Sequence, residues 1–305
     1  MKLDEYPLAM LPPNRDIDPW VATMLSVDLR GRRHVLKRFK PTPMPPFLYK
    51  YFSSNSPYSH CNLRDVIVGP VLRLNPPSEF NDPFEMRAHF VMTATEDEKR
   101  TRFESLAREQ APHLGWRAVQ ARVEELMAGT EEYFTPIWQQ SLKNIREEAG
   151  VYCFAGSGKS TLLWSHYAED HKGVCLQFER VQDIAILSHA LRVRYVPDLP
   201  VLNWVVGFHE GIGEMIFAKH PCWEYEQESR IMIYGQGGRY LRYAPQALRK
   251  LIFGCRAEPV LVDAVSGWLE ERAELGHPPI EVYAARQHPT KYRLVVGRRE
   301  SAKSA

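Results

Sequence analysis

The sequence predicts an α+β fold: a single domain built on a mixed or antiparallel sheet, with a helical insertion at about residues 95–148. The chain has 305 residues, of which 44% are hydrophobic and 25% are charged, as in ordinary globular proteins. Apolar residues recur at helical spacing within the insertion, and short apolar runs typical of strands lie on both sides of it. We therefore expect an arm at 1–46, one domain at 47–297 and a polar, disordered tail at 298–305.

Composition excludes several classes of protein. The net charge is only +2, so no global field attracts DNA or a membrane. No run approaches the roughly 18 apolar residues of a membrane span, and the N-terminus does not resemble a secretory signal. The five cysteines are an odd number without CxxC spacing, which argues against a disulfide framework or a structural zinc site. We expect a soluble, cytoplasmic protein without a metal.

The N-terminal arm is rich in proline and contains a basic run at residues 30–40. Such a run is compatible with a patch for nucleic acid or an acidic partner. It is equally typical of a solvated strand edge, where Lys and Arg discourage edge-to-edge pairing. The second interpretation is favoured, because no aromatic residues repeat through the run to stack on bases.

The domain begins with a strand at 47–51, a short helix near 63–68 and a second strand at 71–74, followed by a loop at 75–84 that is rich in helix and strand breakers. The insertion opens with a capping box, Thr95 to Glu98, and is broken near Pro112 and Gly115. Its last helix carries apolar residues at helical spacing: Phe134, Ile137, Trp138, Leu142 and Ile145.

After Gly150 the pattern changes to short strands, with one helix at about 259–275. The strands are expected at residues 151–154, 174–178, 191–195, 229–234, 251–253, 280–283 and 292–296.

Residues 154–161 resemble a phosphate-binding loop, because Gly158, Lys159 and Ser160 follow a predicted strand. The first glycine of that motif is replaced by Cys153, whose Cβ opposes the tight turn. We interpret the segment as a Gly/Ser surface loop.

Two histidines, His166 and His171, lie five residues apart, whereas metal-binding pairs on a helix are four apart. His171 is expected at the end of a helix, where it can meet unpaired carbonyls. A serine-histidine triad is not favoured, because Ser165 adjoins His166 and no GxSxG motif exists.

The segment with the most chemistry contains Glu226, Glu228 and Arg230. In an extended chain these alternate residues share one face, about 6.5–7 Å apart. Two carboxylates beside a guanidinium can hold a sugar hydroxyl or stabilise developing positive charge. They can equally form a strand face that balances its own charge, and the sequence leaves both interpretations open.

Four blocks together resemble the bacterial family called domain of unknown function 2971. They are Leu48-Tyr49-Lys50-Tyr51; Pro77 to Glu85, with Asn81-Asp82-Pro83-Phe84-Glu85; Leu163 to Ala168 with His171 to Phe178; and Lys219 with Trp223 to Arg230. The resemblance covers residues 47 to about 254 and departs from the family at Phe52, where an arginine is usual. It implies no established reaction, and it groups the chain with abortive-infection proteins of phage defence.

The first functional hypothesis is a toxin-type or defence transferase that is ADP-ribosyltransferase-like, by analogy in the order of its parts. It would cleave the nicotinamide–ribose bond of NAD and modify a macromolecular target, protein or nucleic acid, with an antitoxin or defence partner and no membrane. Glu228 would stabilise the oxocarbenium-like charge and Glu226 would orient or activate the acceptor. The candidate catalytic residues are Glu228, Glu226 and His166. The candidate cofactor-binding residues are Lys50, Tyr51, Asn81, Asp82, Trp164, Tyr167, Trp223 and Arg230.

Two alternatives remain. The same residues would form a buried structural network in a non-enzymatic defence or interaction protein. In a nuclease, Asp82, Glu85, Glu226 and Glu228 would gather a Mg²⁺ ion. The enzyme hypothesis requires that Tyr51, Asn81, His166 and Glu228 surround one pocket.

Overall fold

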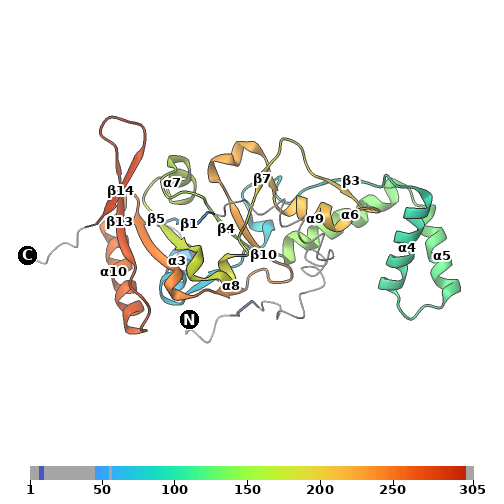
Figure 1. The fold of residues 1–305 in the computed structure, drawn as a ribbon, viewed down its shortest axis with the longest axis horizontal. Helices are drawn as coiled ribbons and strands as arrows, with labels where there is room; N and C mark the ends of the chain where they lie inside the picture. Colours follow the sequence, from blue (N-terminus) through green and yellow to red (C-terminus); the bar gives the residue numbers. More distant parts are fainter. Residues whose placement is uncertain (1–6, 10–44, 55–56, 300–305) are drawn as a thin grey trace, which may run out of the picture.

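The computed structural model describes residues 7–9, 45–54 and 57–299. They form an elongated α+β structure with several small sheets, in which the C-terminal hairpin and the insertion helices occupy opposite ends (Figure 1). Most of the predicted arm, including the basic run at 30–40, and the tail beyond residue 299 lie outside the described residues. Within the described residues, no helix is long and apolar enough to cross a bilayer.

The largest sheet has five strands. Their order is β1 (Phe47–Phe52), β5 (Val174–Glu179), β12 (Leu248–Phe253), β13 (Glu281–Gln287) and β14 (Leu294–Arg298). Only the β12–β13 pair is parallel; the other pairs are antiparallel. Residues 174–178 of β5 are all buried, as expected for a central strand covered on both faces. Helices α3 (Pro57–Val68) and α10 (Pro259–Glu274) pack against each other beside this sheet.

A second sheet meets the first at its β1 edge. It contains β4 (Gly150–Phe154), β10 (Ser229–Ile233) and β6 (Leu191–Arg192), all antiparallel. Two backbone hydrogen bonds join Tyr49 of β1 to Ala155 at the end of β4, with N–O distances of 2.9 and 2.7 Å. The junction brings β1, β4 and β10 close together, and the candidate site lies there.

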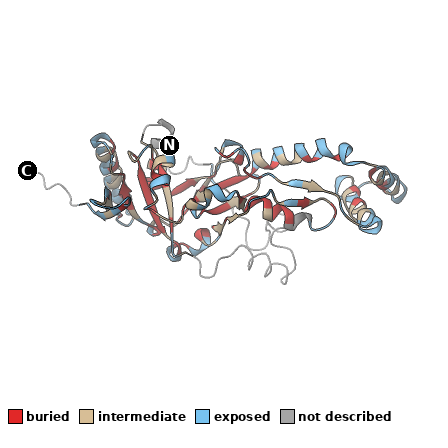
Figure 2. Cartoon of the chain, turned by 90° about the horizontal axis from the view of Figure 1, so that it is seen from above, coloured by how far each residue is buried: buried red, intermediate tan, exposed pale blue. Residues whose placement is uncertain are grey.

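The insertion is helical as predicted, with α4 (Glu96–Gln110), α5 (Trp116–Met127) and α6 (Glu131–Glu148). The predicted capping box at the start of α4 is present: Thr95 accepts from the Glu98 backbone, and Glu98 accepts from that of Thr95. A further break at 128–130, which was not predicted, separates α5 from α6. The insertion has an apolar cluster of its own and largely exposed outer faces (Figure 2). The buried members are Phe103, Ala107, Val119, Val123, Leu126, Phe134 and Trp138.

Short elements complete the described chain. The paired strands are β2 (Val71–Arg73) with β11 (Tyr240–Arg242), β3 (His89–Val91) with β8 (Val201–Asn203), and β7 (Arg194–Tyr195) with β9 (Ala218–Lys219). The short helices are α7 (Thr161–Tyr167), α8 (Ile184–Leu187) and α9 (Phe208–Ile216). The 3-10 helices are Pro77–Glu79, Arg180–Gln182, Pro221–Glu226 and Pro245–Ala247.

Three expectations are corrected. The strand predicted at 191–195 is two strands in different sheets, because the backbone changes partner: Val193 bonds to Glu228 and Arg194 bonds to Phe217. The segment around Glu226 is not extended but forms a 3-10 helix followed by a left-handed Gln227, with φ of 47°. Strand β14 spans Leu294–Arg298, so it begins and ends two residues later than the strand predicted at 292–296.

Candidate functional site

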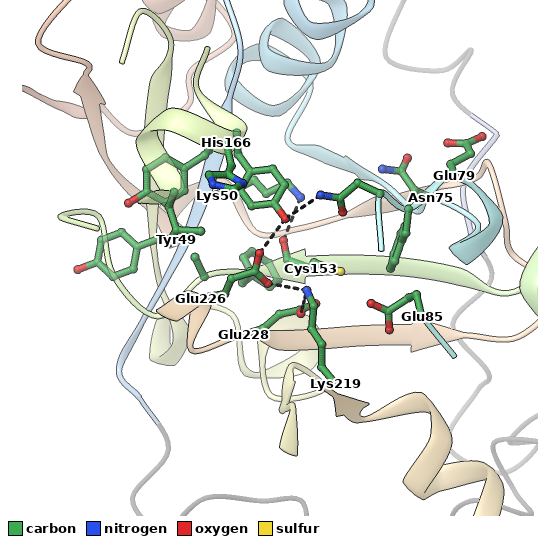
Figure 3. A pocket seen from close by; sticks show the side chains of 17 residues that line it. Tyr49, Lys50, Asn75, Glu79, Glu85, Cys153, His166, Lys219, Glu226 and Glu228 are labelled. Atoms are coloured by element: carbon green, nitrogen blue, oxygen red, sulfur yellow. Dashed lines mark hydrogen bonds and ion pairs between the residues drawn. The ribbon is translucent and has the colours of Figure 1, made fainter. Parts of the chain in front are cut away.

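A cavity of about 440 Å³ lies where the two sheets meet, a volume in the range of small-molecule sites (Figure 3). Its walls come from β1, the 75–85 loop, the end of β4, α7 and the segment that leads into β10. The residues that line it are Tyr49, Lys50, Tyr51, Asn75, Glu79, Phe80, Asn81, Glu85, Cys153, Phe154, Ala155, Leu163, His166, Tyr167, Lys219, Glu226 and Glu228.

A lysine joins two carboxylates in the wall of this cavity. The Lys219 ammonium donates to Glu226 Oε2 at 2.6 Å and to Glu228 Oε2 at 3.0 Å (Figure 3). All three side chains are buried, and Lys219 also lies 4.7 Å from the centre of the Trp223 ring. One ammonium therefore holds both carboxylates in fixed positions.

Arg230 contacts Glu228 from inside the protein. Its guanidinium donates to Glu228 at 2.6 and 3.0 Å and to both oxygens of Glu85 at 2.6 and 3.0 Å. A further hydrogen bond of 2.8 Å reaches the Ile216 carbonyl. Paired, charge-assisted hydrogen bonds of this kind are geometrically specific, so Arg230 fixes the position of the Glu228 carboxylate.

The two carboxylates differ in acidity. Burial alone would raise the pKa of Glu228, but Arg230 and Lys219 hold that pKa well below its ordinary value. Burial raises the pKa of Glu226, and the attraction of Lys219 does not offset this effect. Of the two carboxyl groups, Glu226 is therefore the more easily protonated.

The local backbone geometry places Glu226 in the wall of the cavity. The Gly156 N–H donates to the Glu226 carbonyl at 2.9 Å, which attaches the 3-10 helix to the end of β4. A Cβ at Gly156 would lie 2.6 Å from Gln227 Cβ, closer than real Cβ contacts. The left-handed turn at Gln227 then leads the chain into β10, with Glu228 one residue before the strand.

The glycine-rich loop at 155–160 supports the aromatic wall. The Tyr51 hydroxyl donates to the Ser157 carbonyl at 2.7 Å, and Trp164 Nε1 donates to the Gly158 carbonyl at 3.0 Å. The Tyr51 and Trp164 rings meet edge to face, with centroids 5.1 Å apart. The loop carbonyls are therefore used to position side chains around the cavity.

Helix α7 carries two further residues of the cavity. The Tyr167 hydroxyl donates to Glu226 Oε1 at 2.7 Å, and Asn81 Nδ2 lies 3.5 Å from that hydroxyl. His166 is exposed at the rim, with its ring about 6 Å from those of Tyr167, Trp223 and Tyr225. Asn81, Tyr167 and Glu226 form a hydrogen-bonded row along one wall.

The structure brings seven of the eleven predicted site residues to this cavity. They are Lys50, Tyr51, Asn81, His166, Tyr167, Glu226 and Glu228. Tyr51, Asn81, His166 and Glu228 thus share one pocket, as the enzyme hypothesis requires. The other four lie elsewhere: Trp164 and Arg230 are enclosed in the protein, while Asp82 and Trp223 line a neighbouring cavity of about 390 Å³.

Sequence reasoning missed Lys219 as a site residue and named Glu85 only as a metal ligand of the nuclease alternative, although both belong to the quoted blocks. Lys219 stands alone in the sequence, seven and nine residues from its partners. Glu85 is 145 residues from Arg230, so only the fold brings them together. The available signal for Lys219 was its place at the start of a charged segment that also contains Glu224, Glu226 and Glu228.

The nuclease alternative requires Asp82, Glu85, Glu226 and Glu228 to gather around a cation. Asp82 instead accepts from the Phe84 backbone at 2.9 Å, and Glu85 and Glu228 face Arg230. Across the described ranges, no group of three or more His, Cys, Asp or Glu side chains is arranged to hold a metal ion.

Glu228 should make folding sensitive to acid. Because its folded pKa lies below the ordinary 4.5, its contribution to stability is fully present above that value and is lost as the pH falls below it. We expect Glu228→Gln to be less stable than wild type near pH 7, with the gap narrowing towards pH 3. Urea denaturation across this range measures the effect, and exposed Glu224→Gln is the control. A gap independent of pH would contradict the assignment.

No curated protein and no solved structure matches the chain. One family model does match, and it runs from within α7 to the first part of β10, including Tyr167, Lys219, Glu226 and Glu228. The first two sequence blocks, at 48–51 and 77–85, lie outside this match. Over residues 163–231 the chain matches the family described as Protein of unknown function (DUF2971), which confirms the resemblance to that family.

Proposed function

We propose that the chain cleaves the nicotinamide–ribose bond of NAD and transfers the ADP-ribosyl group to a macromolecular target. One observation supports this most: two carboxylates share the Lys219 ammonium while their pKa values move in opposite directions. Such pairs mark an ionised group and a proton-carrying group in acid–base catalysis.

The chemistry follows the order of charge development. As the bond from ribose C1′ to the nicotinamide nitrogen breaks, its electron pair leaves with nicotinamide and positive charge grows on the ribose. Ionised Glu228 would stabilise that charge. The acceptor atom bonds to C1′ as nicotinamide leaves, and its proton passes in the same step to the ionised form of Glu226. Arg230 acts as a positioning residue, because it holds Glu228 without lining the cavity. Glu85 lines the cavity and anchors Arg230.

The walls of the cavity suit a dinucleotide. Tyr49, Tyr51 and Tyr167 offer ring faces or edges for nicotinamide or adenine. The Lys50 ammonium, which donates to the Cys153 carbonyl at 3.0 Å, lines the cavity and would meet the pyrophosphate. The arrangement in which β1, α7 and the segment before β10 face one cavity supports the ADP-ribosyltransferase analogy.

The biological setting in this proposal is a cytoplasmic toxin-type or phage-defence enzyme. A protein or nucleic-acid target would accept the ADP-ribosyl group, and an antitoxin or defence partner would restrain the activity. The cavity supports the proposed reaction, and the family resemblance suggests the proposed role in defence.

The test uses NAD labelled in the nicotinamide ring, incubated with purified protein and bacterial lysate. Glu226→Gln should lower the rate of nicotinamide release by about 100-fold or more, because the proton-carrying group is lost. Glu224→Gln, on the exposed side of the same 3-10 helix, should retain the wild-type rate. Thermal unfolding of each variant separates lost chemistry from lost structure. No release by folded wild-type protein, or an unchanged rate in Glu226→Gln, would contradict the proposal.

A non-enzymatic defence or interaction protein is the second candidate, and the burial of the ion network favours it. Glu85, Glu228 and Arg230 are 1–3% exposed and satisfy one another, as structural groups do. Under this proposal NAD would bind without turnover, or not at all. Calorimetric titration with NAD, run beside the release assay, distinguishes the two candidates.

A further inference from the structure

A third, larger cavity lies beside the start of α7. Its volume is about 720 Å³, and it is enclosed by the start of α7, the turn at 254–256 and the loop that joins β13 to β14. Figure 1 shows this loop projecting from the end of the molecule that carries the five-stranded sheet. The lining residues are Thr161, His171, Cys255, Arg256, Gln287, His288, Pro289, Thr290, Lys291, Tyr292, Arg293 and Leu294.

The charged residues that line this cavity are all basic. Arg256, Lys291 and Arg293 contribute three exposed cations, and none of the lining residues is acidic. None of the ion pairs recorded between described residues involves these three cations. The Arg256 side chain donates to the Asp170 backbone carbonyl at 3.5 Å. The cations are therefore free to bind an anionic ligand.

An aromatic ring stands between two of the cations. Tyr292 is fully exposed, with no packing to explain a ring at that position. The loop that carries it is held by hydrogen bonds, from His288 N to the Arg293 carbonyl at 3.0 Å and from Thr290 N to His288 Nδ1 at 3.1 Å. A preformed loop presents Tyr292 at a low entropic cost to whatever stacks on it.

The buried Trp164 contacts one residue of this cavity and one residue of the first. It stacks on His171 of the larger cavity, with ring centroids 6.3 Å apart, and meets Tyr51 of the first cavity edge to face.

We propose that this cavity and the adjoining Tyr292 bind single-stranded nucleic acid, with the cations on the phosphodiester backbone and the ring stacked on an unpaired base. Cations that follow a backbone beside an exposed aromatic ring are the general means of binding single strands. A duplex hides its base faces, so Tyr292 would have no role with it. The inference goes beyond NAD cleavage, because binding requires neither NAD nor Glu226.

The test measures fluorescence anisotropy of a labelled single strand of about 12 nucleotides, as RNA and as DNA, with the full chain and without NAD. Three phosphate contacts predict that log affinity falls with log salt with a slope of about −2. The double variant Lys291→Glu/Arg293→Glu should bind at least about tenfold more weakly, with a slope smaller by about 1.4. Tyr292→Ala should weaken binding about fivefold or more and leave the slope unchanged.

Matched controls come from the insertion at the opposite end of the molecule. Arg117→Glu/Lys143→Glu makes the same change in net charge on exposed residues, and Trp116→Ala removes a ring that is 66% exposed. Both controls should bind as wild type does. Equal loss in the controls, tighter binding of a duplex of the same sequence, or binding of polyglutamate alone would overturn the proposal. Glu226→Gln should bind normally, so failure of the NAD proposal would leave this result intact.

Discussion

Replacement of Arg230 by methionine is expected to lower the free energy of unfolding by about 3–5 kcal/mol. The guanidinium is 1% exposed and neutralises two carboxylates that are equally enclosed, Glu85 and Glu228. Methionine preserves the apolar volume but leaves both carboxylates without their main cation. Urea denaturation monitored by tryptophan fluorescence measures the loss.

The matched control for Arg230 is Arg108→Met. Arg108 pairs with Glu104 at 2.7 Å on the surface of α4, where the two side chains are 54% and 36% exposed. An exposed pair contributes about 0–1 kcal/mol, so this variant should remain close to wild type. If Arg230→Met lost no more stability than Arg108→Met, the buried network would contribute little to folding.

A second large effect is expected from Gly173→Ala, which should destabilise the chain by about 3 kcal/mol through overpacking. A Cβ at Gly173 would lie 1.9 Å from the Phe52 carbonyl oxygen, at the end of the β1–β5 pairing. Backbone on both sides must move, because Gly173 also accepts a hydrogen bond from Gly254 at 2.9 Å.

The same substitution at Gly267 should stabilise the chain. Gly267 lies within α10, where an added Cβ meets nothing within 4 Å. Alanine favours a helix over glycine by about 1 kcal/mol, so Gly267→Ala should raise the midpoint of thermal unfolding. If Gly173→Ala left the midpoint of thermal unfolding as high as Gly267→Ala does, the packing between β1 and the turn before β5 would have room for a Cβ at residue 173.

The sequence predicts best those elements whose signals are local. Thr95 and Glu98 specify the start of α4 within one turn, and the apolar run at 174–178 specifies a buried strand. Helix α9 was not predicted, because two glycines in nine residues weaken its helical pattern.

The site was predicted in its residues more than in its geometry. Glu226, Glu228 and Arg230 do come together, but the reason is a 3-10 helix and the left-handed Gln227, not an extended strand. The contact of Arg230 with Glu85 spans 145 residues, and no local pattern encodes it. Contacts of this range follow from how β10 and the 75–85 loop pack, which the sequence alone does not reveal.

The apolar cluster of the insertion has a consequence for the dynamics of the whole chain. Because α4, α5 and the first half of α6 bury their side chains mainly against one another and against residues near β3 and β8, they form a cooperative unit of their own. Such a unit opens without breaking the five-stranded sheet, so its backbone amides should exchange with solvent deuterium sooner than those of β5 and β12. Proteolysis in the turns at 111–115 and 128–130 would then release α5 while the sheets around Lys219 stay folded.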